Sequence, residues 1–492
     1  MSISKNKFWY KESVWYEVYI DLFYDSNSDG IGDIQGVILK LDYLKSIGVN
    51  TLWLLPFFKS PMKDYGYDVS SYTSIREDIG SIEDFKQLVI KARDMGISII
   101  IDIPLNHTSY KHPWFILSEK KDPKYSNYYL WDNSNTKYQK ASIIFKDYEK
   151  SNWEYSKKRG EYYFHRFYKY QPDLNWKNPD VFNEFVNILD FWAELGVRGF
   201  RIDAAPYLIK KEGTSCENLK ETHRVIKRLK DSINSKYTNV IFISESNLKL
   251  DKIKEYFNEI EMSFNFNMMQ KLMLSLKAEN DRYIRDYIKE YNDIPEKNQF
   301  AGFLRNHDEL TFDNMSKRDI KLFSKKHEEY IYNNGIALRL STLLDNNIDK
   351  IIQGFAILLS LNGAPIIYMG DEYGESESNI KINKFIDKRM LVRKRFKWDN
   401  THNNIIINQL KKIVQVRKKY INIIGYKHSH YNKFENSNIL SFKKDKLEFI
   451  YNLSSKEHIL ENKYKNIILS RKIEKQSNKI LMKGYSYIWI LS

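Results

Sequence analysis

Four strand-like apolar segments spread along this chain each end in a carboxylate, a histidine or an arginine. They occupy residues 102–107, 199–203, 241–245 and 303–308. In a closed barrel of parallel strands, the carboxyl ends of all strands meet at one rim, where the chemistry of such barrels takes place. Polar side chains far apart in the sequence would therefore share one pocket, which predicts acid–base and covalent chemistry on a polar substrate.

The order of strand and helix patterns predicts an α/β fold, a closed (β/α)8 TIM barrel. Strand-like runs alternate with amphipathic segments, one of which begins with a Ser-x-x-Asp capping pattern at Ser81 and ends before Gly96. Repeated strand–helix units with an eighth strand near residue 369 favour a barrel over an open sheet. The expected barrel strands lie at residues 14–20, 51–55, 97–103, 199–202, 240–243, 262–266, 299–304 and 364–369.

Two stretches depart from this alternation. Residues 108–174 are aromatic and polar, and they are too long for an ordinary loop, so we expect a small inserted domain after the third strand. After about residue 405, short alternating segments predict an antiparallel β-sandwich. The expected domains are the barrel at 1–107 and 175–404, the inserted domain at 108–174 and the C-terminal sandwich at 405–492.

The composition indicates a packed globular protein that binds neither nucleic acid nor a membrane. The chain has 492 residues, a hydrophobic content of 42% and a net charge of +15. A basic excess can serve nucleic-acid or membrane binding. Here the lysines are scattered among Asn and Ile without a run of five basic residues, so we expect no nucleic acid and no membrane as partner.

Cys216 is the single cysteine, so an internal disulfide is excluded. The first residues contain no signal-type apolar core, and no apolar stretch reaches the ~18 residues of a spanning helix. We therefore expect a cytoplasmic protein. The sequence leaves the oligomeric state open, a homo-oligomer included.

Three strand-end carboxylates, Asp203, Glu245 and Asp308, suit chemistry at an acetal carbon. A retaining mechanism uses one carboxylate as nucleophile and a second carboxyl group first as acid and then as base. Arg201 lies two residues before Asp203, so both side chains point to the same face of a strand. There the guanidinium is expected to lower the pKa of the nucleophile. Each motif alone could be an ordinary structural strand end, but four in barrel order favour a shared site.

Residues 8–375, with these motifs in order, resemble the α-amylase superfamily of retaining α-glycoside enzymes. The resemblance implies that Asp203 is the nucleophile, Glu245 the general acid/base and Asp308 the transition-state stabiliser. It also implies a pocket closed at one end around a non-reducing glucose. The implied substrate-binding residues are Asp64, Tyr67, His107, Arg201, His307 and Arg393.

The segment 171–175, Gln-Pro-Asp-Leu-Asn, is similar to the oligo-1,6-glucosidase-like branch of that superfamily. Within this branch, residues 203–208, 212–223 and 303–311 look most like trehalose synthase. This resemblance implies interconversion of two small α-glucosides, maltose and trehalose, through a covalent glucosyl-enzyme intermediate. An α-glucosidase that hydrolyses short α-glucosides is the alternative, because residues 393–398 depart from the family pattern near the pocket. An inactive binding or scaffold barrel is the remote alternative.

Residues 25–33 offer oxygen ligands at alternate positions, which suits a hard structural cation, Ca²⁺ or Mg²⁺. The expected ligands are Asp25, Asn27, Asp29, the carbonyl of Ile31 and Asp33. A turn of Asn, Asp and Gly without metal is the alternative, and the family resemblance favours calcium. The resemblance also implies a second metal site at Asn106, Asp173 and the carbonyls of Tyr207 and Leu208.

Overall fold

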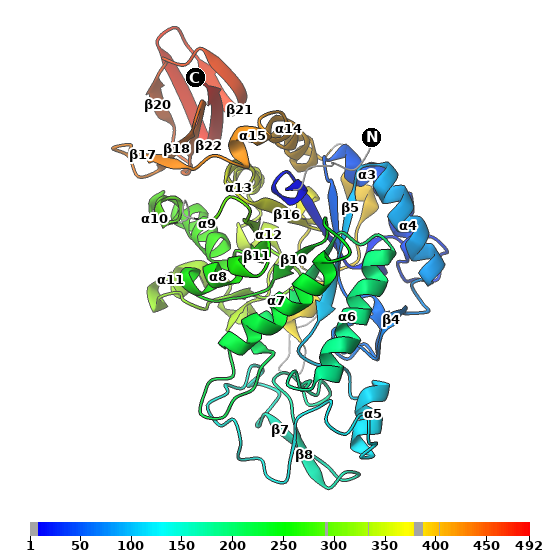
Figure 1. Ribbon diagram of the computed structural model, residues 1–492. Coiled ribbons are helices and arrows are strands. Elements are labelled where there is room, and N and C mark those ends of the chain that lie inside the picture. Colours follow the sequence, from blue (N-terminus) through cyan, green and yellow to red (C-terminus); the bar gives the residue numbers. More distant parts are fainter. Residues whose placement is uncertain (1–7, 291–293, 333, 378–386, 403) are drawn as a thin grey trace.

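Eight parallel strands close into a barrel at the centre of the protein (Figure 1). The computed structural model describes residues 8–290, 294–332, 334–377, 387–402 and 404–492, so the N-terminal segment 1–7 lies outside the described residues. The strand order around the barrel is β1-β16-β12-β11-β10-β9-β5-β2, and β16 pairs with β1 to close it. The barrel strands are β1 (Trp15–Val18), β2 (Thr51–Leu54), β5 (Ser98–Pro104), β9 (Gly199–Asp203), β10 (Ile241–Ser244), β11 (Met262–Phe264), β12 (Gln299–Phe303) and β16 (Ala364–Tyr368). Each of the eight predicted strands overlaps one of these, and the predicted closed barrel is confirmed.

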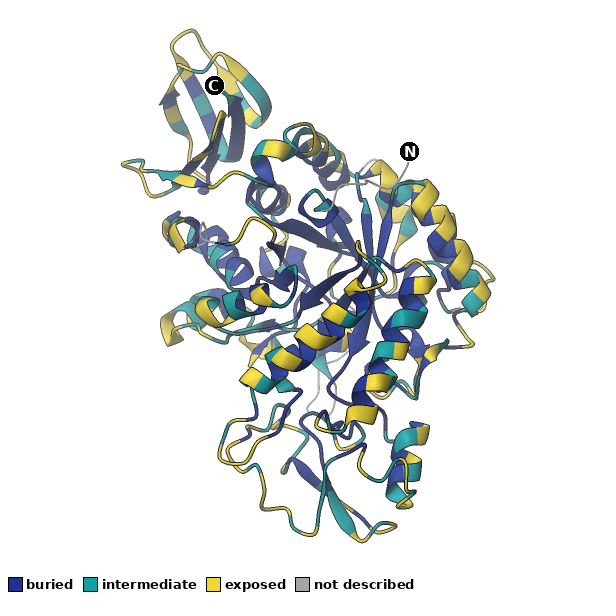
Figure 2. Ribbon diagram, viewed as in Figure 1, coloured by how far each residue is buried: buried dark blue, intermediate teal, exposed yellow. Residues whose placement is uncertain are grey.

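Burial on both faces explains why the barrel strands are nearly continuous apolar runs. In Figure 2 the barrel strands are dark blue, whereas the surrounding helices show exposed residues on their outer faces. The capping box predicted at Ser81 is present, because its side chain accepts the N–H of Asp84 while the Asp84 side chain accepts the N–H of Ser81. The helices are α1 (Ile20–Phe23), α2 (Ile34–Leu39), α3 (Leu41–Ser46), α4 (Ile82–Asp94), α5 (Pro113–Glu119), α6 (Pro179–Glu194), α7 (Lys220–Asn234), α8 (Leu250–Glu255), α9 (Phe266–Ala278), α10 (Arg282–Glu290), α11 (Lys317–Ser324), α12 (Leu340–Leu343), α13 (Ile348–Ser360), α14 (Ile405–Lys419) and α15 (Ile421–Ile424).

The chain between β5 and α6 forms a separate lobe, at the bottom of Figure 1. This lobe contains α5 and a three-stranded antiparallel sheet in the order β6-β8-β7. Its strands are β6 (Trp131–Asp132), β7 (Trp153–Ser156) and β8 (Glu161–Phe164). An isolated antiparallel bridge between His107 and Asp173 joins the two ends of the lobe, so it rises from the carboxyl end of the barrel.

The C-terminal residues form an antiparallel β domain, as predicted, and its paired strands belong to one sheet instead of the two of a sandwich. This domain lies at the end of the molecule opposite the lobe (Figure 1). Its strands follow the order β17-β18-β19-β22-β20, and β21 pairs with β22 along the other edge. They are β17 (His430–Asn432), β18 (Ile439–Lys444), β19 (Leu447–Asn452), β20 (His458–Glu461), β21 (Asn466–Lys475) and β22 (Lys479–Leu491). Apolar side chains such as Ile450 and Ile488 give this domain a core of its own.

Short strands at the carboxyl end of the barrel complete the fold. They are β3 (Phe58–Lys59), β4 (Ser71–Ile75), β13 (Leu310–Thr311), β14 (Ile331–Tyr332) and β15 (Gly335–Ile336). Among the described residues, none of the helices combines the length and the apolar character needed to cross a membrane.

Candidate functional site

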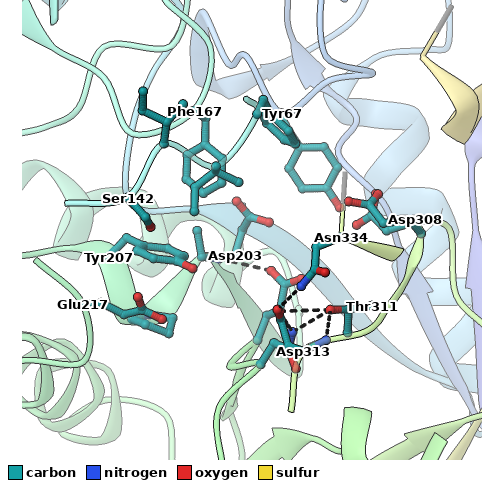
Figure 3. A pocket seen from close by; sticks show the side chains of 18 of the residues that line it. Tyr67, Ser142, Phe167, Asp203, Tyr207, Glu217, Asp308, Thr311, Asp313 and Asn334 are labelled. Atoms are coloured by element: carbon teal, nitrogen blue, oxygen red, sulfur yellow. Dashed lines mark hydrogen bonds between the residues drawn. The ribbon is translucent and has the colours of Figure 1, made fainter. Parts of the chain in front are cut away.

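The three predicted catalytic carboxylates line one cavity at the carboxyl rim of the barrel (Figure 3). Asp203 is the last residue of β9, Glu245 follows β10, and Asp308 lies beyond the end of β12. The cavity has a volume of about 710 Å³ and also receives Asp64, Tyr67 and His107. The barrel therefore brings together residues from both halves of the chain, as the strand-end pattern predicted, while the role of each residue stays a prediction.

Arg201 connects two of the cavity carboxylates, Asp203 and Glu245, to the buried Asp102. Its guanidinium is fully buried, and Nη1 lies 2.7 Å from Oδ1 of both Asp102 and Asp203. Its Nη2 lies 2.7 Å from Oε2 of Glu245. One buried cation thus holds the expected nucleophile and the expected acid/base side by side, which a retaining pair requires.

Arg201 lowers the pKa of Asp203 as expected, but the net shift of that pKa is upward. Burial raises the pKa of Asp203 well above its ordinary value, the charge of Arg201 lowers it, and Glu245 and Asp102 raise it further. Burial likewise raises the pKa of Asp102 to about 6 against the influence of Arg201. The carboxylate cluster therefore retains a proton at a pH where a solvated aspartic acid has lost it, and a retaining mechanism needs one proton on its pair of carboxyl groups.

His307 links Asp308 to a buried carboxylate that the sequence analysis did not include. Its Nδ1 lies 2.5 Å from Oε1 of Glu17 on β1, and its Nε2 lies 3.0 Å from Oδ2 of Asp308 and 2.7 Å from the hydroxyl of Tyr67. Burial alone would lower the pKa of His307, but the charges of Asp308 and Glu17 outweigh burial and raise it to about 9. The imidazolium in turn holds the pKa of Asp308 well below its ordinary value despite burial.

Asp64 and Arg389 form an ion pair that lines one end of the cavity. Arg389 Nη2 lies 2.8 Å from Asp64 Oδ1, and Gln171 donates to the other carboxylate oxygen at 2.9 Å. The predicted Arg393 instead donates to Asp308 at 2.6 Å and to the backbone carbonyl of His307 at 3.1 Å. Arg389 lines the cavity, and Arg393 braces the carboxylate expected to stabilise positive charge.

His107 presents a ring nitrogen that is available to a ligand. The side chain is buried, lines the cavity, and its Nε2 has no hydrogen-bond partner in the described chain. Burial lowers the pKa of His107, so the imidazole is neutral at physiological pH. A neutral imidazole can donate to, or accept from, one hydroxyl of a sugar.

The other half of the cavity contains polar residues that the sequence analysis missed. Asn247 donates to Thr311 Oγ1 at 3.0 Å and to Asp313, and Tyr207 and Glu217 face them across the cavity (Figure 3). A usable signal was present for three of them. Asn247 lies two residues after Glu245, and Thr311 and Asp313 lie three and five residues after Asp308, so each belongs to a loop that begins at a predicted catalytic carboxylate.

A buried lysine takes the place predicted for the second metal, which corrects that expectation. Lys210 Nζ lies 2.7 Å from Asn106 Oδ1 and 2.5 Å from Asp173 Oδ2, and all three side chains are buried. The ammonium supplies the positive charge that Asp173 needs, so Asn106 and Asp173 do not fit a metal ion, and the expected carbonyl ligands, Tyr207 and Leu208, lose their side-chain partners in such a site.

The predicted first metal loop is a tight, self-bonded turn. Asp25 accepts the N–H groups of Ser28 and Gly30 and lies 2.9 Å from Arg395, while Asp33 caps α2 by accepting the N–H of Gly36. The side-chain oxygen of Asn27 accepts the N–H of Asp29, and a side-chain oxygen of Asp29 accepts the N–H of Ile31. Within the described residues, no three His, Cys, Asp or Glu side chains converge on a common point as a metal site would need. A cation here would require the Asn27 amide and the Ile31 carbonyl as ligands, and calcium stays a prediction.

Comparisons with known proteins agree with this arrangement. The family model described as alpha amylase, catalytic domain, matches residues 17–436. The trehalose synthase of Thermus thermophilus is 41% identical over 397 residues, covering 79% of this chain and 40% of that protein. The trehalose synthase/amylase of Mycolicibacterium smegmatis is 40% identical over 385 residues, covering 74% of this chain and 64% of that protein.

This chain spans less than two thirds of the length of those two curated relatives. The crystal structure of an alpha-amylase from H. orenii matches the fold with a TM-score of 0.81 at 25% identity, covering 98% of this chain and 99% of that one. The family model spans most of the chain, two relatives are about 40% identical to it, and the fold is shared. The chain therefore belongs to the α-amylase family.

Proposed function

We propose that this protein interconverts maltose and trehalose by transferring an α-glucosyl group with retention of configuration. The observation that carries the proposal is the composition of the cavity. One end is fixed by the Asp64–Arg389 ion pair, Asp203 and Glu245 lie between, and a polar half beyond them has room for a second sugar. Two relatives at about 40% identity that are named trehalose synthase support the choice of substrates.

In the first step, the Asp203 carboxylate attacks the anomeric carbon of the non-reducing glucose of maltose. Glu245 donates its proton to the glycosidic oxygen O4, so the C1–O4 bond breaks as the bond between C1 and the carboxylate forms. Arg201 holds both carboxyl groups in place. Asp308, kept ionised by His307, lies in the same cavity, where its charge stabilises the positive charge that develops at C1.

In the second step, the released glucose stays in the cavity and turns so that its anomeric hydroxyl faces C1. Glu245, now a carboxylate, takes the proton of this hydroxyl while the oxygen attacks C1 and displaces Asp203. Two inversions at C1 retain the α configuration, and the product has a 1,1 linkage. Both enzyme carboxyl groups return to their starting protonation states, so no external reagent is consumed.

Hydrolysis of maltose by the same residues is the second candidate function. Water instead of glucose would then displace Asp203, and an α-glucosidase would result. The name of the M. smegmatis relative, trehalose synthase/amylase, joins both kinds of activity in one protein, which supports hydrolysis as a second candidate. An inactive scaffold is disfavoured, because Asp203, Glu245 and Asp308 all face the same cavity.

Incubation with maltose, followed by separation of the sugars, tests the proposal. We expect trehalose as the main product with a minor amount of glucose, and we expect maltose when trehalose is the input. Glucose without trehalose would favour the hydrolase. The Asp203→Asn variant is the matched control, since removal of the nucleophile should lower turnover by more than ~10³-fold. If no α-glucoside is consumed by the native protein, the scaffold interpretation gains.

We further propose that the loop of residues 25–33 binds a structural calcium ion. Its oxygen donors suit a hard cation, and the turn is already shaped by hydrogen bonds from Ser28 and Gly30 to Asp25. Bound calcium would compete with Arg395 for Asp25. Thermal denaturation with calcium, with magnesium and with a chelator tests this, and a midpoint that does not respond to either ion would refute it. Asp29→Asn should weaken a response to calcium without changing turnover, because Asp29 lies outside the cavity.

A further inference from the structure

The half of the cavity beyond Asp203 has two polar walls. On one wall, Asn247 donates to Thr311 at 3.0 Å and to Asp313, and Thr311 donates to Asp313 at 3.0 Å. On the facing wall lie Tyr207 and Glu217 (Figure 3). A carboxylate therefore stands on each side of the space next to the reacting centre.

The backbone on both sides of Glu217 adopts a left-handed conformation. The φ angles are 56° at Cys216 and 51° at Asn218, and such values are uncommon for residues other than glycine, although Asn adopts them more readily than Cys. Tertiary contacts impose this shape: the Asn218 N–H donates to the carbonyl of Pro206 at 2.8 Å, and its side chain lies 3.1 Å from His223 Nε2. The fold thus bears a conformational cost to turn Glu217 toward the cavity, and strain of this kind concentrates at functional sites.

Arg166 holds Glu217 in place without occupying its oxygens. The guanidinium is fully buried and donates to the carbonyl of Ser215 and to Ser142 Oγ, both at 3.1 Å. Its Nη2 lies 3.7 Å from Glu217 Oε2, which is longer than a hydrogen bond. Within the described residues, no hydrogen bond reaches the Glu217 carboxylate, so both oxygens remain available to accept from a ligand.

We infer that Glu217 binds the glucose released in the first step and, with Asp313 opposite, keeps it in the cavity while it turns. This inference rests on the proposed isomerase function. The released glucose departs through O4 and must return through O1, and these groups lie at opposite ends of the pyranose ring. The sugar therefore has to reverse its direction inside the cavity. Acceptors on both walls can hold its hydroxyls in either direction, so the sugar is retained longer than the glucosyl-enzyme survives before transfer.

The variants Glu217→Ala and Glu217→Gln test this role, with Glu221→Gln as the matched control. Glu221 lies four residues away on α7, outside the cavity, and pairs with Lys211 at 3.0 Å on the surface. Three rates are measured: formation of trehalose from maltose, release of glucose from maltose, and release of 4-nitrophenol from 4-nitrophenyl α-glucoside.

Loss of a charge-assisted hydrogen bond to the retained sugar predicts a trehalose-to-glucose product ratio at least ~10-fold lower in Glu217→Ala. In Glu217→Gln, which keeps a neutral acceptor, the trehalose-to-glucose ratio should be lower by at least about 3-fold. Hydrolysis of the aryl glucoside should stay within about threefold of the native rate, because its departure does not depend on a retained glucose. The Glu221→Gln ratio should be native. A ratio within twofold of the native value in both Glu217 variants would overturn the inference. If Glu217→Ala fails to fold by circular dichroism, the near-isosteric Glu217→Gln decides alone.

The native enzyme separates this inference from the proposed function. If native protein releases glucose from maltose but makes no trehalose, the isomerase proposal fails while Glu217 can still be judged as a ligand of the leaving glucose. In that case kcat/KM for maltose, divided by kcat/KM for the aryl glucoside, should fall at least ~10-fold in Glu217→Ala. An unchanged quotient would refute binding of the leaving sugar by Glu217.

Discussion

Replacement of Glu17 by glutamine should shift the alkaline limit of activity to lower pH. Glu17 is completely buried, and its Oε1 lies 2.5 Å from Nδ1 of His307. The other ring nitrogen of His307 lies 3.0 Å from Asp308. A neutral imidazole carries a single N–H, whereas an imidazolium carries two, so only the charged ring can donate to both carboxylates at once. Glu17 thus supplies the counter-charge that keeps His307 in the doubly donating form.

The size of the effect follows from the pKa of His307. Its value of about 9 lies roughly 2.5 pH units above the ordinary 6.5, which corresponds to about 3 kcal/mol in favour of the charged ring. Asp308 and Glu17 both supply this energy against the penalty of burial. Removal of Glu17 should take away about half, so that the pKa falls by about 1–2 units into the range of the assay. Above that pH, Asp308 loses the positive charge of His307, although the guanidinium of Arg393 still donates to it at 2.6 Å.

The assay is kcat/KM for 4-nitrophenyl α-glucoside between pH 5 and pH 10. Tyr67 and Tyr19 also face His307, but burial raises their pKa well above 10, so they do not titrate in this range. The matched control is Glu372→Gln, since Glu372 is an equally buried carboxyl group whose hydrogen bonds go to Tyr16, Tyr43 and the N–H of Gly370 instead of His307. The alkaline limb should move down by about 1–2 units in Glu17→Gln and stay in place in Glu372→Gln.

Stability provides a second readout with a defined sign. A histidine whose pKa is raised on folding contributes stability that is complete below about pH 6.5 and is lost as the pH rises through about 9. The midpoint of thermal denaturation of Glu17→Gln should therefore lie furthest below the native midpoint near pH 6, and the gap should narrow toward pH 9. An alkaline limb that does not move, or a stability gap that widens with pH, would refute the account of Glu17.

Three further perturbations have outcomes that the contacts determine. Lys210→Met leaves the buried carboxylate of Asp173 and the amide of Asn106 without their cation, and the unfolding free energy from urea denaturation should fall by about 3–5 kcal/mol. A fall below about 1 kcal/mol would show that the Lys210–Asp173 pair is dispensable. Arg389→Lys replaces a planar guanidinium with a point charge, so we expect the KM for maltose to rise about tenfold with little change in the kcat for the aryl glucoside. Equal falls in the kcat for maltose and the kcat for the aryl glucoside would argue against a binding role. Ser81→Ala removes the capping box of α4 and should cost about 1 kcal/mol in unfolding free energy with native turnover, a pattern that any loss of activity would contradict.

The sequence was sufficient for the barrel and for the residues expected to do chemistry, because both depend on local patterns. A buried parallel strand is a largely apolar run, and the groups expected to be catalytic lie at its carboxyl end or within five residues after it. Asp203, Glu245 and Asp308 carry this signal, so their convergence needs only the barrel topology.

The interactions that tune these residues depend on burial and on long-range packing, which the sequence does not display. Glu17 appears in the sequence as one polar residue within a short strand, and only closure of the barrel brings it to His307, 290 residues away. The net direction of the Asp203 pKa depends on desolvation, which outweighs the adjacent Arg201. Lys210 lies just after the two expected carbonyl ligands, but its role as replacement for a cation requires the folded position of Asp173.

The distribution of charge along the cavity supports an isomerase over a simple hydrolase. At the end with the Asp64–Arg389 pair, the carboxylates are held by cations, Asp64 by Arg389 at 2.8 Å and Asp308 by Arg393 at 2.6 Å. Beyond Asp203 the pattern changes, because Asp313 is held by neutral amides and Glu217 is only loosely paired at 3.7 Å. A rigid end suits a glucosyl group that must stay fixed while its anomeric carbon reacts twice. Loosely held acceptors suit a sugar that must exchange its hydrogen bonds as it turns, whereas a hydrolase binds its leaving glucose in one direction only.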